Sequence, residues 1–191
     1  MKQIAVFLDR DGTVNEEMGY INHLSRFVLL PRTGAAIKRL NDAGLKVVLV
    51  TNQSGAARGY FPASLVDEVH AHLLNLLAQD GARLDGIYTC LHGPQDGCDC
   101  RKPQPELILR AAREMHLDLS RSYMVGDRYK DLQTGAKAGV KGVLVLTGYG
   151  RGEYEHFGRT WEVQPDHIAG DLLDAAEWII QDLHKISPGK I

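Results

Sequence analysis

The chain has 191 residues, 44% hydrophobic and 24% charged, with a formal net charge of -2 from 22 basic and 24 acidic side chains. This composition is typical of a soluble globular protein and excludes a disordered or fibrous one. The near-neutral charge gives no broad positive field for a nucleic-acid backbone, so we expect no nucleic-acid partner. The length predicts a single domain over residues 1–191, with one active site.

Two features of the sequence indicate its compartment. The apolar run over residues 4–8 stops at Asp9 and is too short for a signal peptide, and no other segment is long enough to cross a bilayer, so we expect no membrane partner. All three cysteines lie within residues 90–100, which favours a metal site in a reducing compartment over a disulfide scaffold. We therefore predict a cytoplasmic protein, which we expect to be a monomer.

Short apolar runs rich in β-branched residues alternate with helical patterns along the chain. The apolar runs predict strands over residues 4–8, 46–50, 86–89, 122–125 and 142–146. Apolar side chains at helical spacing predict helices over residues 34–43, 65–77, 107–115, 131–138 and 171–184. Loops are expected over residues 15–26, 53–62, 90–100 and 148–158, and a frayed tail over residues 187–191. This alternation predicts an α/β, Rossmann-like fold of three layers with a mainly parallel sheet and no separate cap domain.

Two carboxylates follow the first predicted strand. Asp9 and Asp11 are two residues apart, so both side chains can face the crevice at the carboxyl end of a parallel strand, where Gly12 allows close approach of the backbone. The two acids repel each other unless a divalent cation neutralises them, and Mg²⁺ prefers oxygen ligands. A solvated Asp-Gly turn is the alternative, and the motif alone does not decide between the two.

The second and fourth predicted strands also end in polar residues. Residues 51–55 offer the Thr51 hydroxyl, side-chain amides and backbone N–H groups that could hold phosphoryl oxygens. Asp127 follows the fourth strand and is a candidate third contact to the metal, whereas Asp131 is expected to orient that loop or to cap the next helix. Ordinary turn and capping residues are the alternative for each stretch.

The segment after the third predicted strand contains a set of soft ligands. Cys90, His92, Cys98 and Cys100 form a C-x-H-x5-C-x-C pattern, and four such ligands complete the tetrahedral site typical of structural Zn²⁺. The alternative is three small buried thiols beside a surface histidine. The zinc-binding loop over residues 90–100 would brace the two cations that follow it, Arg101 and Lys102, and Lys102 could neutralise a phosphoryl group.

Taken together and in this order, the segments 9–13, 51–55, 101–103 and 126–131 resemble the four motifs of the haloacid dehalogenase-like phosphatases. The resemblance extends over about residues 4–147. It implies that Asp9 is the nucleophile and Asp11 the general acid/base. It also implies that Thr51 and Lys102 stabilise the phosphoryl group, and that Asp127 binds Mg²⁺ together with Asp9 and the main-chain carbonyl of Asp11.

The Cys/His loop narrows the resemblance to a branch whose members act on heptose bisphosphates or on histidinol phosphate. This implies removal of the 7-phosphate of D-glycero-D-manno-heptose 1,7-bisphosphate in lipopolysaccharide precursor synthesis. Arg101 and Arg128 could grip a second phosphate, which favours a sugar bisphosphate. Histidinol phosphate is the alternative substrate, and a zinc-braced phosphate-binding module is the non-enzymatic alternative.

The resemblance also predicts which side chains contact the sugar or its distal phosphate. Together with Arg128, which is chosen for its charge, these positions are Glu17, Met18, Gly19, Tyr20, Asn52, Gln53, Ser54 and Arg101. His70 and His72 lie two residues apart on a predicted helix and cannot share a face, so both are predicted to be ordinary helix residues.

Overall fold

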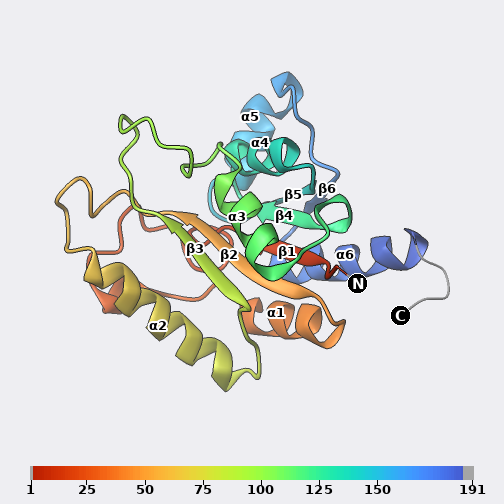
Figure 1. Ribbon diagram of the computed structural model, residues 1–191, viewed down its shortest axis with the longest axis horizontal. Coiled ribbons are helices and arrows are strands. Elements are labelled where there is room, and N and C mark those ends of the chain that lie inside the picture. Colours follow the sequence, from red (N-terminus) through yellow and green to blue (C-terminus); the bar gives the residue numbers. More distant parts are fainter. Residues whose placement is uncertain (1, 187–191) are drawn as a thin grey trace.

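The computed structural model describes residues 2–186, so the predicted frayed tail lies outside the described residues. Six parallel strands form one sheet in the order β3-β2-β1-β4-β5-β6 (Figure 1). The strands are β1 (Ala5–Leu8), β2 (Lys46–Asn52), β3 (Gly86–Cys90), β4 (Tyr123–Gly126), β5 (Lys141–Val145) and β6 (His167–Ala169). Because Leu8 pairs with both Leu49 and Val125, the carboxyl ends of the three central strands lie at one edge of the sheet, where β2 extends beyond β1 to Asn52.

Helices cover both faces of the sheet, as the alternation of elements predicted. They are α1 (Thr33–Asp42), α2 (Ser64–Gln79), α3 (Glu106–Met115), α4 (Tyr129–Ala138), α5 (Gly150–Phe157) and α6 (Leu172–Ile186). Successive side chains of β1 point to opposite faces, so Val6 and Leu8 pack with α1, α2 and α6, whereas Phe7 packs with α3. The fold is therefore the predicted three-layer α/β arrangement, and its central strands are buried on both faces.

The segment after β5 differs from the prediction. Residues 148–158 were expected to form a loop but contain α5, and β6 was not predicted. Gly150 is buried at the start of α5, where an added Cβ would lie 1.9 Å from the carbonyl oxygen of Val145, so only glycine fits. The ring of Trp161, next to α5, stacks on that of Tyr129 with centroids 4.7 Å apart. Tertiary packing of this kind outweighs the weak helical preference of a segment with two glycines.

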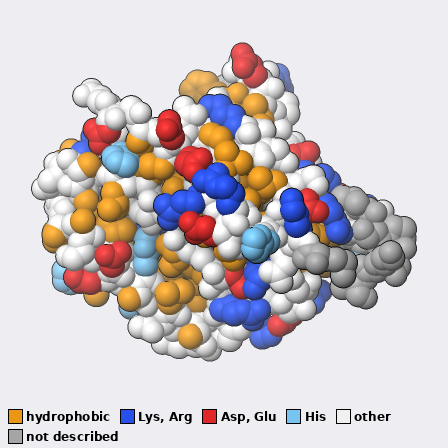
Figure 2. Space-filling model, viewed as in Figure 1, with side chains coloured by type: hydrophobic (Ala, Val, Ile, Leu, Met, Phe, Trp, Pro, Cys, Tyr) orange, Lys and Arg blue, Asp and Glu red, His pale blue; other side chains and the backbone are white. Residues whose placement is uncertain are grey.

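The surface agrees with the near-neutral composition. On the face drawn in Figure 2, basic and acidic side chains are intermixed rather than gathered into a field of one sign. Within residues 2–186, no helix is both long and apolar enough to cross a membrane.

Candidate active site

Three buried carboxylates meet beyond the ends of β1 and β4. One oxygen from each of Asp9, Asp127 and Asp131 lies within 4.8 Å of the others, and these residues are 6%, 0% and 0% exposed. The strand register brings Asp9 and Asp127 to the same edge, and Asp131 joins them from the first turn of α4. Three acids so close together are costly without positive charge, so the cluster is suited to a cation.

A buried lysine supplies part of that charge. The Nζ of Lys102 lies 2.8 Å from Oδ1 of Asp9 and 2.7 Å from Oδ1 of Asp131. Burial alone lowers the pKa of Lys102, but the two carboxylates outweigh it and raise the pKa to about 12. Asn52 positions the lysine, because its side-chain oxygen accepts from the N–H of Lys102 at 3.0 Å and its amide donates to the Lys102 carbonyl at 3.2 Å. Asn52, predicted to contact substrate, therefore also fixes a cation of the site.

Asp127 has one oxygen available for a metal ion. Its Oδ2 accepts a hydrogen bond of 2.8 Å from the backbone N–H of Tyr149, whereas its buried Oδ1 has no hydrogen-bond partner. Burial, followed by the charges of Asp9 and Asp131, raises the pKa of Asp127 to about 8. A bound Mg²⁺ would satisfy this oxygen, so the residues present fit the ion.

The close packing around Asp127 explains a glycine of the first motif. Gly12 has φ +81°, and a Cβ at this position would lie 2.2 Å from Oδ2 of Asp127. The carbonyl of Gly12 also accepts a hydrogen bond of 2.6 Å from the Thr147 hydroxyl, which ties the first motif to the loop after β5. Glycine is therefore required here for both conformation and space.

Asp131 has the role that the sequence predicted for it. Its Oδ2 accepts a hydrogen bond of 3.1 Å from the backbone N–H of Arg128, which caps α4, and its Oδ1 pairs with Lys102. Both oxygens of Asp131 therefore have partners. The carboxylate oxygen that remains available to a metal ion belongs to Asp127.

The side chain of Asp11 is held by three neighbours. Its oxygens accept hydrogen bonds from Arg10 Nε (3.2 Å) and Nη2 (2.9 and 3.0 Å), Asn15 Nδ2 (3.0 Å) and Gln53 Nε2 (2.8 Å). Burial raises the pKa of Asp11, but Arg10 and the hydrogen bonds from Asn15 and Gln53 outweigh it and hold that pKa below its ordinary value. A general acid must carry a proton, so this arrangement corresponds to the ionised, proton-accepting state.

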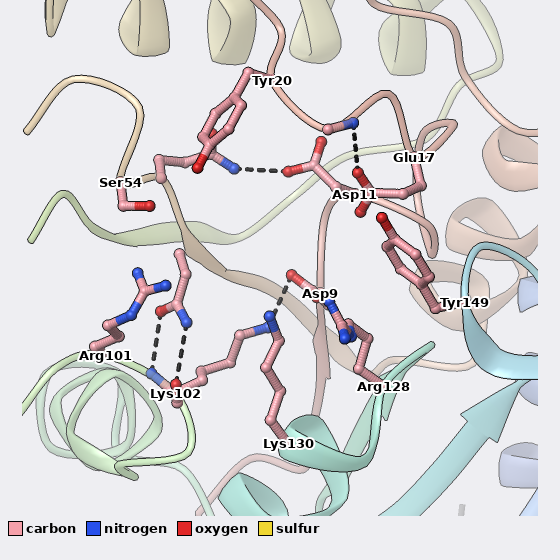
Figure 3. Close-up of a pocket in the computed structure, with 13 residues that line it drawn as sticks. Asp9, Asp11, Glu17, Tyr20, Ser54, Arg101, Lys102, Arg128, Lys130 and Tyr149 are labelled. Atoms are coloured by element: carbon pink, nitrogen blue, oxygen red, sulfur yellow. Dashed lines mark hydrogen bonds and ion pairs between the residues drawn. The ribbon is translucent and has the colours of Figure 1, made fainter. Parts of the chain in front are cut away.

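Most of the predicted substrate contacts line one cavity of about 270 Å³, together with Asp9, Asp11 and Lys102 (Figure 3). Those in its wall are Glu17, Gly19, Tyr20, Asn52, Gln53, Ser54, Arg101 and Arg128. Met18 does not line the cavity; it faces a neighbouring groove beside Tyr60 and is 37% exposed. Thr51 lies beneath the wall, where its hydroxyl accepts a hydrogen bond of 2.9 Å from Gln53.

Two lining residues were not predicted. Lys130 and Tyr149 reach the cavity from α4 and from the loop before α5. In Figure 3, Tyr149 lies on the side of Arg128, opposite Arg101 and Ser54, and Lys130 lies between Lys102 and Arg128. Tyr149 lies within a Gly-Tyr-Gly segment directly after the fifth strand, which is a signal that sequence reasoning could have used. Lys130, one residue before Asp131, carries no such signal.

The cations of the cavity differ in their partners. Arg128 pairs with Glu153, with 2.7 Å between Nε and Oε1, and its guanidinium carbon lies 4.4 Å from the ring centre of Tyr149. Arg101 donates to the carbonyl of His92 at 3.2 Å, and no carboxylate among residues 2–186 forms an ion pair with Arg101 or Lys130. Arg101 and Lys130 are therefore the cations available to an incoming anion.

The four predicted zinc ligands are brought together. One ligand atom from each of Cys90, His92, Cys98 and Cys100 lies within 4.8 Å of the others, and no disulfide joins the cysteines. The Sγ of Cys90 lies 3.7 Å from that of Cys98, and the Nδ1 of His92 lies 3.2 Å from the Sγ of Cys100. Such spacing suits ligands around one tetrahedral ion.

Comparisons with known proteins agree with this geometry. A family model described as HAD-hydrolase-like (haloacid dehalogenase-like) matches residues 99–175. A Thermosynechococcus vestitus protein described as D-glycero-D-manno-heptose-1,7-bisphosphate 7-phosphatase is 43% identical, with 96% of this chain and 98% of that protein covered. A Bordetella bronchiseptica protein described as D-glycero-beta-D-manno-heptose-1,7-bisphosphate 7-phosphatase is 39% identical, with 93% and 98% covered.

Solved structures give the same result. The D,D-heptose 1,7-bisphosphate phosphatase from B. bronchiseptica, complexed with magnesium and phosphate, has a TM-score of 0.86 and 40% identity, with 95% of this chain and 99% of that one covered. The enzyme of the same name from Burkholderia thailandensis has a TM-score of 0.71 and 32% identity, with 93% and 99% covered. The chain therefore belongs to the haloacid dehalogenase-like phosphatases, in the family that these heptose-bisphosphate phosphatases represent.

Proposed function

We propose that this phosphatase removes the 7-phosphate of D-glycero-D-manno-heptose 1,7-bisphosphate, with Asp9 as the nucleophile. The observation that carries the proposal is the position of Asp9, which lines the cavity while its carboxylate lies beside Lys102 and the Asp127 carboxylate. Its Oδ1 forms an ion pair with Lys102 and accepts a hydrogen bond of 2.7 Å from the backbone N–H of Arg10. These two donors orient the carboxylate toward a bound phosphoryl group.

In the proposed reaction Asp9 attacks phosphorus in line, and the bond between phosphorus and the sugar oxygen breaks. In the substrate complex Asp11 must carry a proton, which it gives to the departing alkoxide; the resulting carboxylate later takes one from the water that hydrolyses the aspartyl-phosphate. Lys102 offsets the negative charge that the phosphoryl group brings beside Asp9. Mg²⁺ held by Asp9, Asp127 and the main-chain carbonyl of Asp11 would neutralise charge on the transferred oxygens.

The preference for a bisphosphate is supported by the two cations that lack a carboxylate partner. Arg101 and Lys130 both line the cavity, Arg101 from the segment before α3 and Lys130 from α4, so a second phosphate of the substrate could contact both. Arg128, which the sequence favoured for this role, is already paired with Glu153, so Lys130 is the better partner for Arg101. Histidinol phosphate carries amines and would gain less from this wall. The names of the relatives described above point to the same substrate class.

We also propose that the Cys/His cluster binds one structural Zn²⁺. Four protein ligands would fill a tetrahedral shell and leave no open position for a reaction. Arg101 follows the cluster directly in the chain and donates to the carbonyl of His92, itself one of the ligands. The ion would therefore hold Arg101 and Lys102 at the cavity wall.

Steady-state kinetics with Mg²⁺ on both anomers of the heptose bisphosphate and on histidinol phosphate test the proposed function. We expect the highest kcat/KM on a bisphosphate anomer. A higher value on histidinol phosphate would reassign the substrate, and no phosphate release from any sugar phosphate would favour a binding module. Replacement of the nucleophile, Asp9→Asn, should lower kcat by at least about 10³-fold. Substantial residual hydrolysis by that variant would refute the role of Asp9.

A further inference from the structure

The side chain of Arg10 is buried between Asp11 of the first motif and His70 of helix α2. It is only 2% exposed and is among the largest fully buried side chains of the described residues. Its Nε and Nη2 donate to both oxygens of Asp11, and its Nη1 lies 3.5 Å from Nε2 of His70. Among residues 2–186, the ion pairs of this buried guanidinium involve one carboxylate, that of Asp11, and a histidine lies beside it, which is an unusual use of an arginine.

His70 is suited to support Arg10 as a neutral group. It lies on the buried side of α2 and is 7% exposed. Burial and the charge of Arg10 lower the pKa of His70 to about 4, and the opposing effects of Asp67 and Asp11 are smaller. A neutral imidazole with its proton on Nδ1 presents a lone pair on Nε2, which can accept from Nη1 of Arg10.

The contacts of Arg10 orient both catalytic carboxylates. Its backbone N–H donates to Oδ1 of Asp9 at 2.7 Å, while its guanidinium grips Asp11 through both oxygens. Asn15 and Gln53 complete the set of donors to Asp11, so the rotamer of this carboxylate is fixed at the edge of the cavity. Without Arg10, Asp11 would keep one donor on each oxygen and could rotate.

We propose that Arg10 and His70 are positioning residues for proton transfer by Asp11: His70 fixes the guanidinium of Arg10, and Arg10 fixes the carboxylate of Asp11 against the leaving oxygen of the substrate. The proposal depends on the function proposed above. It adds two residues that belong neither to the lining of the cavity nor to the carboxylate cluster, one of which lies on a helix 60 positions away in the sequence.

Proton transfer has a signature that a merely structural role lacks. A sugar alkoxide needs the proton of Asp11 as its bond to phosphorus breaks, whereas p-nitrophenolate is stable without one. Loss of positioning should therefore slow leaving-group release from an alkyl phosphate much more than release from p-nitrophenyl phosphate. Damage to the fold or to the metal site would slow both releases alike.

The variants Arg10→Lys, His70→Leu and His70→Gln test the proposal in single-turnover measurements of leaving-group release. Arg10→Lys keeps the positive charge but loses the bidentate contact of the guanidinium with Asp11. The rate of leaving-group release should therefore fall about 100-fold for the sugar phosphate and less than about tenfold for p-nitrophenyl phosphate. His70→Leu should lose about tenfold on the sugar phosphate. His70→Gln, whose side-chain oxygen can take the place of Nε2, should recover most of that loss. Arg39→Lys, at an exposed ion pair with Glu177, is the matched control and should resemble the wild type.

Equal losses on both phosphates, or a His70→Leu variant as fast as the wild type, would overturn the proposal. If the wild type prefers another alkyl phosphate, the substrate proposal fails, while the ratio between alkyl and aryl phosphates still tests the positioning. If the wild type hydrolyses neither, crystal structures of Arg10→Lys and His70→Leu decide: an Asp11 carboxylate in an unchanged orientation in both variants contradicts the inference.

Discussion

The backbone N–H of Tyr149 donates a hydrogen bond of 2.8 Å to Oδ2 of Asp127, although 22 positions separate the two residues. This bond joins the loop after β5 to the loop after β4 and leaves Oδ1 of Asp127 as the buried oxygen without a partner. The segment over residues 148–158, which was predicted only to form a loop, thus orients a carboxylate of the candidate metal site.

We expect Asp127→Asn to stabilise the metal-free protein and to abolish its response to Mg²⁺. Burial and two neighbouring acids raise the pKa of Asp127 to about 8. Between the ordinary pKa of an aspartate and pH 8, the folded state therefore binds more protons than the unfolded state. The stability of the metal-free protein consequently falls as the pH rises toward 8. Mg²⁺ at about 100 times its Kd should stabilise the wild type by about 2.7 kcal/mol. Thermal unfolding at pH 8 with and without Mg²⁺ measures both effects, and a wild-type melting temperature unaffected by Mg²⁺ contradicts this account.

Lys130→Met should weaken binding of the distal phosphate. Removing one charged contact to phosphate should raise the KM for a sugar bisphosphate about tenfold, with kcat and the KM for the matching monophosphate nearly unchanged. Lys137→Met, at an exposed position of the same helix, is the control. Equal increases in KM for the bisphosphate and the monophosphate would mean that Lys130 contacts the transferred phosphate or the sugar.

The zinc proposal predicts one equivalent of Zn²⁺ per chain by elemental analysis. Cys98→Ser should lose the ion, lower the melting temperature and reduce kcat, because the wall that carries Arg101 and Lys102 would no longer be braced. Asp99→Asn alters the exposed residue between two ligands and should retain the zinc. A Cys98→Ser variant with full zinc content would exclude the four-ligand site.

His70 should make folding stability depend on pH below neutrality. Its pKa falls from 6.5 to about 4 on folding, so between these values the unfolded state binds a proton that the folded state does not, and stability decreases as the pH falls. The expected loss attributable to His70 between pH 7 and about pH 4.5 is about 2 kcal/mol. Urea unfolding of the wild type and of His70→Gln should show a smaller loss in the variant, and parallel curves would contradict the shift.

The sequence predicted the residues of the site better than it predicted the elements that hold those residues in place. Asp9, Asp127 and the Cys/His ligands follow apolar runs or share a compact spacing, so local patterns were enough to place them. β6 has only three residues and lacks an apolar run, and α5 forms through aromatic packing, so neither gives a local signal.

The contacts of His70 could not be predicted for a related reason. The helical spacing correctly placed His70 on α2, but only the fold brings that helix against Arg10. Likewise, the preference of Arg128 for Glu153 depends on α5, which was not predicted. Contacts between distant segments depend on tertiary structure, whereas the ends of strands and the spacing of metal ligands can be read from local sequence patterns.

Lys102 is 3% exposed, and its ammonium group lies between two carboxylates. Amine-directed reagents and acetylating enzymes need a neutral, accessible amine, so the folded protein shields Lys102 from them. Covalent labelling of intact protein would tag surface lysines and leave this one unmodified. An inventory of reactive lysines would therefore overlook the lysine that lies 2.8 Å from Asp9.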